Sequence, residues 1–110
     1  MPPPSKLAIV TSSVARLMKD KQSYQKELEE QEERIKKLEN ETSEDENAGY
    51  LLKQERGNLE ETKRMIPDLQ KRIVDASKKL EQQLSDDAAL ATPEEVAAAE
   101  NALKAVGSIP

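Results

Sequence analysis

The sequence contains no cysteine, no histidine, no tryptophan and no phenylalanine. Without cysteine the chain cannot form a disulfide framework, a thiolate nucleophile or a cysteine-ligated zinc site. Without histidine it lacks the commonest general base and the commonest metal-ligating side chain. No phosphate-binding loop, catalytic triad or calcium-loop spacing takes their place. We therefore expect a protein that is not an enzyme and that uses no cofactor and no metal ion.

Large apolar residues are also scarce. Apolar residues make up 35% of the chain, and its aromatic residues are two tyrosines. This composition disfavours a thick globular core, but it suffices for narrow seams between helices. No apolar run approaches the ~20 residues of a membrane span, and the opening Met-Pro-Pro-Pro-Ser does not resemble a signal peptide. We expect a cytoplasmic protein without a membrane partner.

The apolar residues that are present recur at alternating steps of three and four, which is the a/d spacing of a coiled coil. The first series is Leu7, Val10, Val14, Leu17, Tyr24, Leu28, Ile35 and Leu38, and the second is Leu52, Leu59, Ile66, Leu69, Ile73, Ala76 and Leu80. The two series mirror each other about position 45, so that Tyr24 would face Ile66. This is the register of an antiparallel helical hairpin closed by a loop around residues 43–47.

Local signals place the helix ends. Ser5 follows three prolines as an N-cap, so the first helix would span about residues 6–40 and the second about 47–84. After a linker over residues 85–91, Thr92-Pro93-Glu94-Glu95 combines a capping box with proline at the first helical position. This start signal predicts a third helix over about residues 93–106, with Gly107 and Pro110 as stop signals.

The third helix would return along the paired ends of the first two, because a short linker connects it to the end of the second. Five further apolar residues beside the seam favour that position: Ile9, Met18, Met65, Val74 and Leu84. The predicted fold is all-α, an elongated antiparallel three-helix bundle in a single domain over residues 1–110.

Four seam positions and one proline interrupt the pattern. Lys21, Gln31, Glu55 and Thr62 place polar side chains on the seam. Their expected role is to fix the register, with a partner-binding role as the alternative. Pro67 lies inside the second helix, where it removes a backbone donor and predicts a kink with its convex side toward solvent. We expect the kink to serve packing or to shape a binding surface, and Tyr24 and Ile66 to pack at the bend.

The net charge of −5 is unevenly distributed. Residues 27–46 carry ten acidic and three basic side chains, whereas residues 53–79 carry eight basic and five acidic ones. An acidic chain without a continuous basic surface is a poor nucleic-acid binder, so a protein partner is expected. Two sets of residues are candidate contacts on helix faces: an acidic set (Glu29, Glu30 and Glu33) and a basic set (Arg64, Lys71 and Lys78).

The spacing of opposite charges along each helix favours ion pairs, which support the second half of the first helix and indicate a solvated outward face on the second. In the first helix the pairs are Glu30–Arg34, Glu32–Lys36 and Glu33–Lys37, and in the second they are Glu61–Arg64, Asp68–Lys71 and Asp75–Lys78. Across the hairpin, Glu32 is expected near Arg56.

Two segments, residues 23–32 (SYQKELEEQE) and 64–72 (RMIPDLQKR), resemble the tubulin-binding cofactor A family. The specific feature is Met-Ile-Pro-Asp inside a helix, since proline within a heptad pattern is rare in ordinary coiled coils. The resemblance covers roughly residues 6–84. It implies a three-helix bundle that captures β-tubulin released from the cytosolic chaperonin and holds it before assembly with α-tubulin. Other tubulin-folding cofactors would be further partners, and the protein would be cytoplasmic and cytoskeleton-associated.

A competing interpretation is a cytosolic coiled-coil adaptor or a syntaxin-like three-helix interaction domain. Two other helical classes fit less well. A spectrin-type repeat would carry a core tryptophan, and a prefoldin subunit would carry β-hairpins between its helices, whereas the expected loop offers acidic turn residues.

Overall fold

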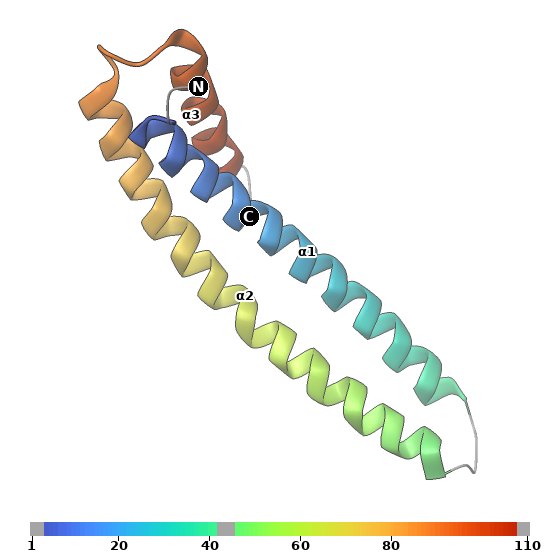
Figure 1. Ribbon diagram of the computed structural model, residues 1–110. Helices are drawn as coiled ribbons and strands as arrows, with labels where there is room; N and C mark the ends of the chain where they lie inside the picture. Colours follow the sequence, from blue (N-terminus) through green and yellow to red (C-terminus); the bar gives the residue numbers. More distant parts are fainter. Residues whose placement is uncertain (1–3, 42–45, 108–110) are drawn as a thin grey trace. The chain divides into compact units, whose positions relative to one another are not determined.

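The computed structural model describes residues 4–41 and 46–107. These residues form α1 (Lys6–Asn40), α2 (Glu46–Asp87) and α3 (Pro93–Gly107), and no strand occurs among them (Figure 1). The all-α class with three helices is confirmed. Of the loop expected around residues 43–47, residues 43–45 lie outside the described part of the chain, as do Pro2, Pro3 and Pro110.

The chain divides into two compact units. The first unit combines Met1–Asp20 with Leu69–Pro110, and the second unit is Lys21–Asp68. The division falls inside α1 and inside α2, because each of these helices contributes residues to both units. The expected single domain stays a prediction.

The first unit has a core built from all three helices. Leu7, Val14 and Met18 of α1 pack with Ile73 and Leu80 of α2, and Ala99 of α3 completes the cluster. Leu7, Val14, Leu80 and Ala99 are fully buried. Alanine on α3 allows its backbone to approach the other two helices closely, so a short helix can cover their seam. The predicted position of the third helix, beside the start of α1 and the end of α2, is confirmed for this unit.

Three of the five apolar residues expected to flank α3 are instead exposed. Met18 is buried and Leu84 packs against the core, but Ile9 and Val74 of the same unit are 52% and 40% exposed. Ile9 lies nine residues before Met18, which is about two and a half helical turns, so it points to the opposite side of α1. Since α3 covers one side of α1, Ile9 faces solvent. Met65, in the second unit, is 44% exposed.

The amino-terminal caps of α1 and α3 are formed as predicted, and they are joined to each other. The Ser5 hydroxyl accepts a hydrogen bond from the Ala8 amide at 3.1 Å. In the capping box, the Glu95 amide donates to the Thr92 hydroxyl at 3.2 Å and the Thr92 amide donates to the Glu95 carboxylate at 3.3 Å. The Ser5 hydroxyl also donates to Glu95, so one carboxylate connects the starts of two helices.

This shared cap predicts a pH-dependent contribution to stability. The hydrogen bond from Ser5, followed by those from the amide and hydroxyl of Thr92, lowers the pKa of Glu95 below its usual value. A lowered pKa in the folded state stabilises the fold above the unfolded-state value of about 4.3 and loses that effect as the pH falls through the folded-state value. Glu95→Gln should therefore lower the melting temperature at pH 7, and the difference from wild type should shrink toward pH 3.

The matched control is Glu94→Gln, because Glu94 lies in the same first turn of α3 and is exposed. Melting curves recorded from pH 7 to pH 3 should show a much smaller pH-dependent difference for that variant. Equal pH dependence of the two variants would contradict the assignment to the shared cap.

The second helix continues three residues beyond its expected end, and the linker is correspondingly shorter. In its last turns Gln82 donates to Asp86 at 3.0 Å and Gln83 donates to Asp87 at 2.7 Å. Such pairs four residues apart support a helix. The amides of Leu90 and Ala91 then donate to the Asp87 carbonyl at 2.9 and 2.8 Å, which terminates α2 in a tight turn. The helix end predicted from sequence, at about residue 84, did not take these two side-chain pairs into account.

The second unit has a more polar interior than the first. Among its described residues, the buried apolar side chain is Ile35, while Lys21, Gln31 and Thr62 are 3–5% exposed. Thr62 satisfies its hydroxyl by donating to the Asn58 carbonyl at 3.0 Å. The carboxamide oxygen of Gln31 and one carboxylate oxygen of Glu55 are buried without a hydrogen-bond partner. The burial of Lys21, Gln31 and Thr62 confirms that these residues lie on the seam. The unpartnered polar atoms of Gln31 and Glu55 lower the stability of the fold, because burying a polar group without a hydrogen bond costs free energy.

Candidate functional site

The two candidate contact sets consist of exposed side chains. The acidic set (Glu29, Glu30 and Glu33) lies on α1 in the second unit. The basic set lies on α2, with Arg64 in the second unit and Lys71 and Lys78 in the first. Within the described part of the chain, none of these six side chains is engaged in a hydrogen bond or an ion pair. Their charges therefore remain open to a partner.

The predicted intrahelical ion pairs are wrong. Among the described residues, none of the six pairs expected along α1 and α2 forms. On α2, Lys63 lies 3.9 Å from Glu60 instead. The physical reason is that an exposed pair gains only ~0–1 kcal/mol while it orders two long side chains, so spacing alone does not enforce contact.

Two arginines of the second unit form ion pairs between α1 and α2 instead. Arg34 Nε lies 3.4 Å from Glu55 Oε1, and Arg56 Nη2 lies 3.2 Å from Glu39 Oε1. The Arg34–Glu55 pair falls within one position of the mirror register, which supports that register in this unit. The expectation that Glu32 lies near Arg56 is wrong, because the Arg56 guanidinium turns to Glu39, two turns farther along α1.

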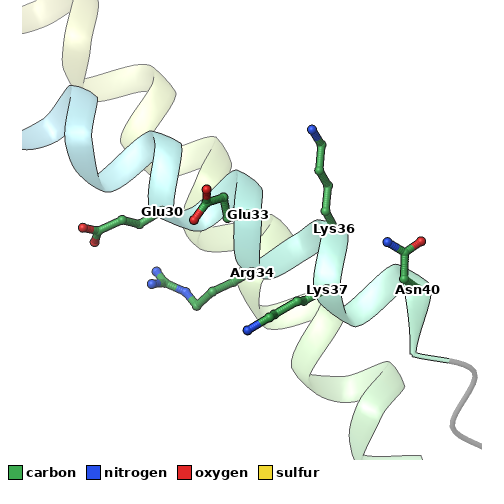
Figure 2. Close-up of a pocket in the computed structure, with 6 residues that line it drawn as sticks. All are labelled: Glu30, Glu33, Arg34, Lys36, Lys37 and Asn40. Carbon is green, nitrogen blue, oxygen red and sulfur yellow. The ribbon is translucent and has the colours of Figure 1, made fainter.

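A charged recess runs along α1 near the end of the helix. It has a volume of about 500 Å³ and is lined by Glu30, Glu33, Arg34, Lys36, Lys37 and Asn40. Figure 2 shows Glu30, Arg34 and Lys37 projecting to one side of the helix, whereas Lys36 projects away from them. The structure thus places two members of the acidic set beside three basic residues, and Glu29 does not line the recess. The surface is of mixed charge rather than uniformly acidic.

A second, smaller recess adjoins this surface in the second unit. It measures about 240 Å³ and is lined by Arg34, Lys37, Leu38, Glu41, Leu51 and Glu55. Leu51 is 47% exposed and its neighbour Tyr50 is 65% exposed. Sequence reasoning missed this recess, although a signal was present: Tyr50 and Leu51 precede the seam residue Leu52 and fall off the a/d pattern.

The three residues assigned a structural role have different exposures. Tyr24 and Ile66 are half-buried in the second unit, and Pro67 is exposed inside α2. The helix continues on both sides of Pro67. Its outward position agrees with the sequence prediction, whereas the kink and the packing role stay predictions.

The chemistry available in the described residues is that of a binding surface. In residues 4–41 and 46–107, no group of three or more acidic side chains is arranged to hold a metal ion. The described helices contain no apolar stretch long enough for a membrane span. What the structure offers is exposed, unpaired charge on helix faces together with shallow recesses, which suits recognition of another protein.

Comparison with known proteins identifies the relatives of this chain. Residues 2–103 match the family model described as tubulin binding cofactor A. The chicken (Gallus gallus) tubulin-specific chaperone A is 37% identical over 100 residues, covering 91% of this chain and 89% of the relative. The rabbit (Oryctolagus cuniculus) protein of the same name is 38% identical over 89 residues, covering 81% and 79%.

The tubulin-specific chaperone A of Saccharomyces cerevisiae is 37% identical over 79 residues, covering 72% of each chain. No solved structure matched the chain. The family model covers nearly the whole sequence and extends into α3 as far as residue 103, beyond the resemblance noted above. This chain belongs to the tubulin binding cofactor A family.

Proposed function

We propose that this protein is a tubulin-folding chaperone that captures β-tubulin intermediates after their release from the cytosolic chaperonin. It holds the subunit ahead of assembly with α-tubulin, in the cytoplasm and in association with the cytoskeleton. The observation that carries the proposal is membership of a family whose relatives are named tubulin-specific chaperone A. Other tubulin-folding cofactors are further partners, and they would receive β-tubulin from this protein.

The surface described above supports a mechanism of capture without catalysis. The members of the acidic and basic sets are exposed and form no ion pair with another described residue. A partner therefore meets them without first breaking such a pair. Charges of this kind steer encounter and fix orientation more than they add affinity. Capture and release then follow from exchange between partners, with no nucleotide consumed by this chain.

The test is a chaperonin reaction in which newly folded β-tubulin is released in the presence or absence of the purified protein. With the protein present, β-tubulin should move into a small complex and should later be recovered in heterodimer on addition of the other cofactors. If β-tubulin is released and assembled identically with and without the protein, the proposal is wrong.

Charge reversal tests which face carries the contact. Substituting all three members of the acidic set by lysine, or all three members of the basic set by glutamate, should slow association about tenfold or more and weaken its dependence on salt. The fold should be unaffected, since exposed charges contribute only ~0–1 kcal/mol each. Stopped-flow association at several salt concentrations and circular dichroism measure the two effects.

The matched control for the acidic set reverses three exposed acidic residues of the first unit that lie outside α3, Asp20, Asp75 and Glu81, and makes the same change in net charge. The association rate of this control should be closer to that of the wild type than the rate of the variant with the reversed acidic set. Normal association of both reversed sets would exclude these faces and move the contact to other surfaces, such as the surface around α3.

A further inference from the structure

A small cavity lies at one end of the first unit. It measures about 210 Å³ and is lined by Ser5, Leu7, Asp87, Leu90, Ala91 and Glu95. The lining comes from the start of α1, the end of α2, the following turn and the first turn of α3. We call it the end cavity. Its volume exceeds the ~30 Å³ share of one water several-fold, so it is large enough for part of a side chain.

Leu90 lies beside the end cavity and is 90% exposed. Its position is fixed rather than accidental, because its amide donates to the Asp87 carbonyl at 2.9 Å and that of Ala91 donates to the same carbonyl at 2.8 Å. A single exposed leucine needs no explanation on its own. Here the leucine stands next to a cavity, so the aliphatic part of an incoming side chain would find apolar contact on Leu90.

The charge of the end cavity has one sign. Two of the six lining residues are acidic, Asp87 and Glu95, and none is basic. Both carboxylates are held in place, Asp87 by Gln83 at 2.7 Å and Glu95 by Ser5 and Thr92. The positive ends of α1 and α3 would oppose a cation, but Ser5, Thr92 and Glu95 already cap them, and the carboxyl end of α2 adds negative potential.

We propose that the end cavity receives a lysine or arginine side chain of the β-tubulin polypeptide, whose aliphatic stem packs on Leu90 and whose charged group meets Asp87 and Glu95. A long cationic side chain is the residue type that has both an apolar stem and a charged head. The proposal rests on the proposed function for the identity of the partner, and it locates one contact of that complex.

The test uses two variants of the full chain that leave the packing intact, Asp87→Asn and Leu90→Ala. Asparagine can still accept the hydrogen bond from Gln83, and Leu90 is almost wholly exposed, so neither variant should change the melting temperature appreciably. Each should weaken binding of purified β-tubulin by about five- to tenfold, and Asp87→Asn should also reduce the salt dependence of the affinity.

Each variant has a close control. Asp86→Asn is matched to Asp87→Asn, because Asp86 accepts the same kind of hydrogen bond, from Gln82, but does not line the cavity. Ile9→Ala is matched to Leu90→Ala, because Ile9 is an exposed aliphatic residue of the same unit away from the cavity. Both controls should bind β-tubulin as the wild type does.

The outcomes separate this proposal from the proposed function. If the wild type binds β-tubulin and both cavity variants bind equally well, the cavity assignment is wrong while the chaperone function stands. If the wild type does not bind β-tubulin, the cavity assignment and the proposed chaperone function are both wrong. If the wild type self-associates in analytical ultracentrifugation and both cavity variants are monomeric, the occupant is a second copy of this chain and the proposal is overturned.

Discussion

Leu80→Ala is expected to destabilise the protein by about 2–5 kcal/mol, the range found when a fully buried leucine is truncated. Leu80 is 0% exposed and belongs to the cluster that joins α1, α2 and α3 in the first unit. Its removal leaves a cavity that the small neighbouring Ala99 cannot fill. Chemical denaturation followed by circular dichroism gives the change in the free energy of unfolding.

The matched control makes the same substitution at Leu90, which is 90% exposed. Leu90→Ala should change the free energy of unfolding by less than about 0.5 kcal/mol, as surface substitutions do. A loss at Leu80 no greater than that at Leu90 would mean that the three-helix core of the first unit is not formed.

Gln31→Leu is expected to stabilise the protein by about 1–3 kcal/mol, because it replaces a buried carboxamide oxygen that lacks a partner with an apolar side chain on the seam. Glu55→Leu should stabilise less. One of its carboxylate oxygens is likewise buried without a partner, but the other pairs with Arg34 at 3.4 Å, and that pair would be lost. Thermal melts of the two variants measure the effect.

Gln25→Leu is the control, since Gln25 is an exposed glutamine of the same helix and gains no burial. Its melting temperature should stay close to that of the wild type. A lower melting temperature for Gln31→Leu would show that the glutamine makes a favourable interaction in the folded state, and the seam of the second unit would need revision.

Backbone features were predictable from sequence because they depend on near neighbours. Ser5 and the Thr92–Glu95 capping box start their helices as expected. The heptad spacing identified four residues of the first unit's core: Leu7, Val14, Ile73 and Leu80. The polar seam residues Lys21, Gln31 and Thr62 are buried, as the same spacing requires.

The positions of long surface side chains were not predictable from spacing. The intrahelical pairs expected on α1 and α2 do not form, and Arg34 and Arg56 contact the other helix of their unit instead. Each of these side chains has several rotamers of similar energy, so the tertiary surroundings decide which is occupied. The same holds for the bond from Ser5 to Glu95, which joins residues 90 positions apart.

The candidate site was predictable only as a class of surface. Exposed charge on helix faces follows from the heptad pattern, and among the residues that the structure describes the acidic and basic sets are unpaired. The recesses and the end cavity depend on how residues from separate segments meet, as with Leu38 and Leu51 or Ser5 and Asp87. The spacing of residues along the chain does not predict which separate segments come into contact.

The proposed function is tested most directly by the stoichiometry of the complex with each tubulin subunit, measured without ATP by size-exclusion chromatography with light scattering. We expect a one-to-one complex with β-tubulin and no comparable complex with α-tubulin alone. Failure to form any complex with β-tubulin would contradict the proposed function, and a cytosolic coiled-coil adaptor would then be the better interpretation of the same three helices.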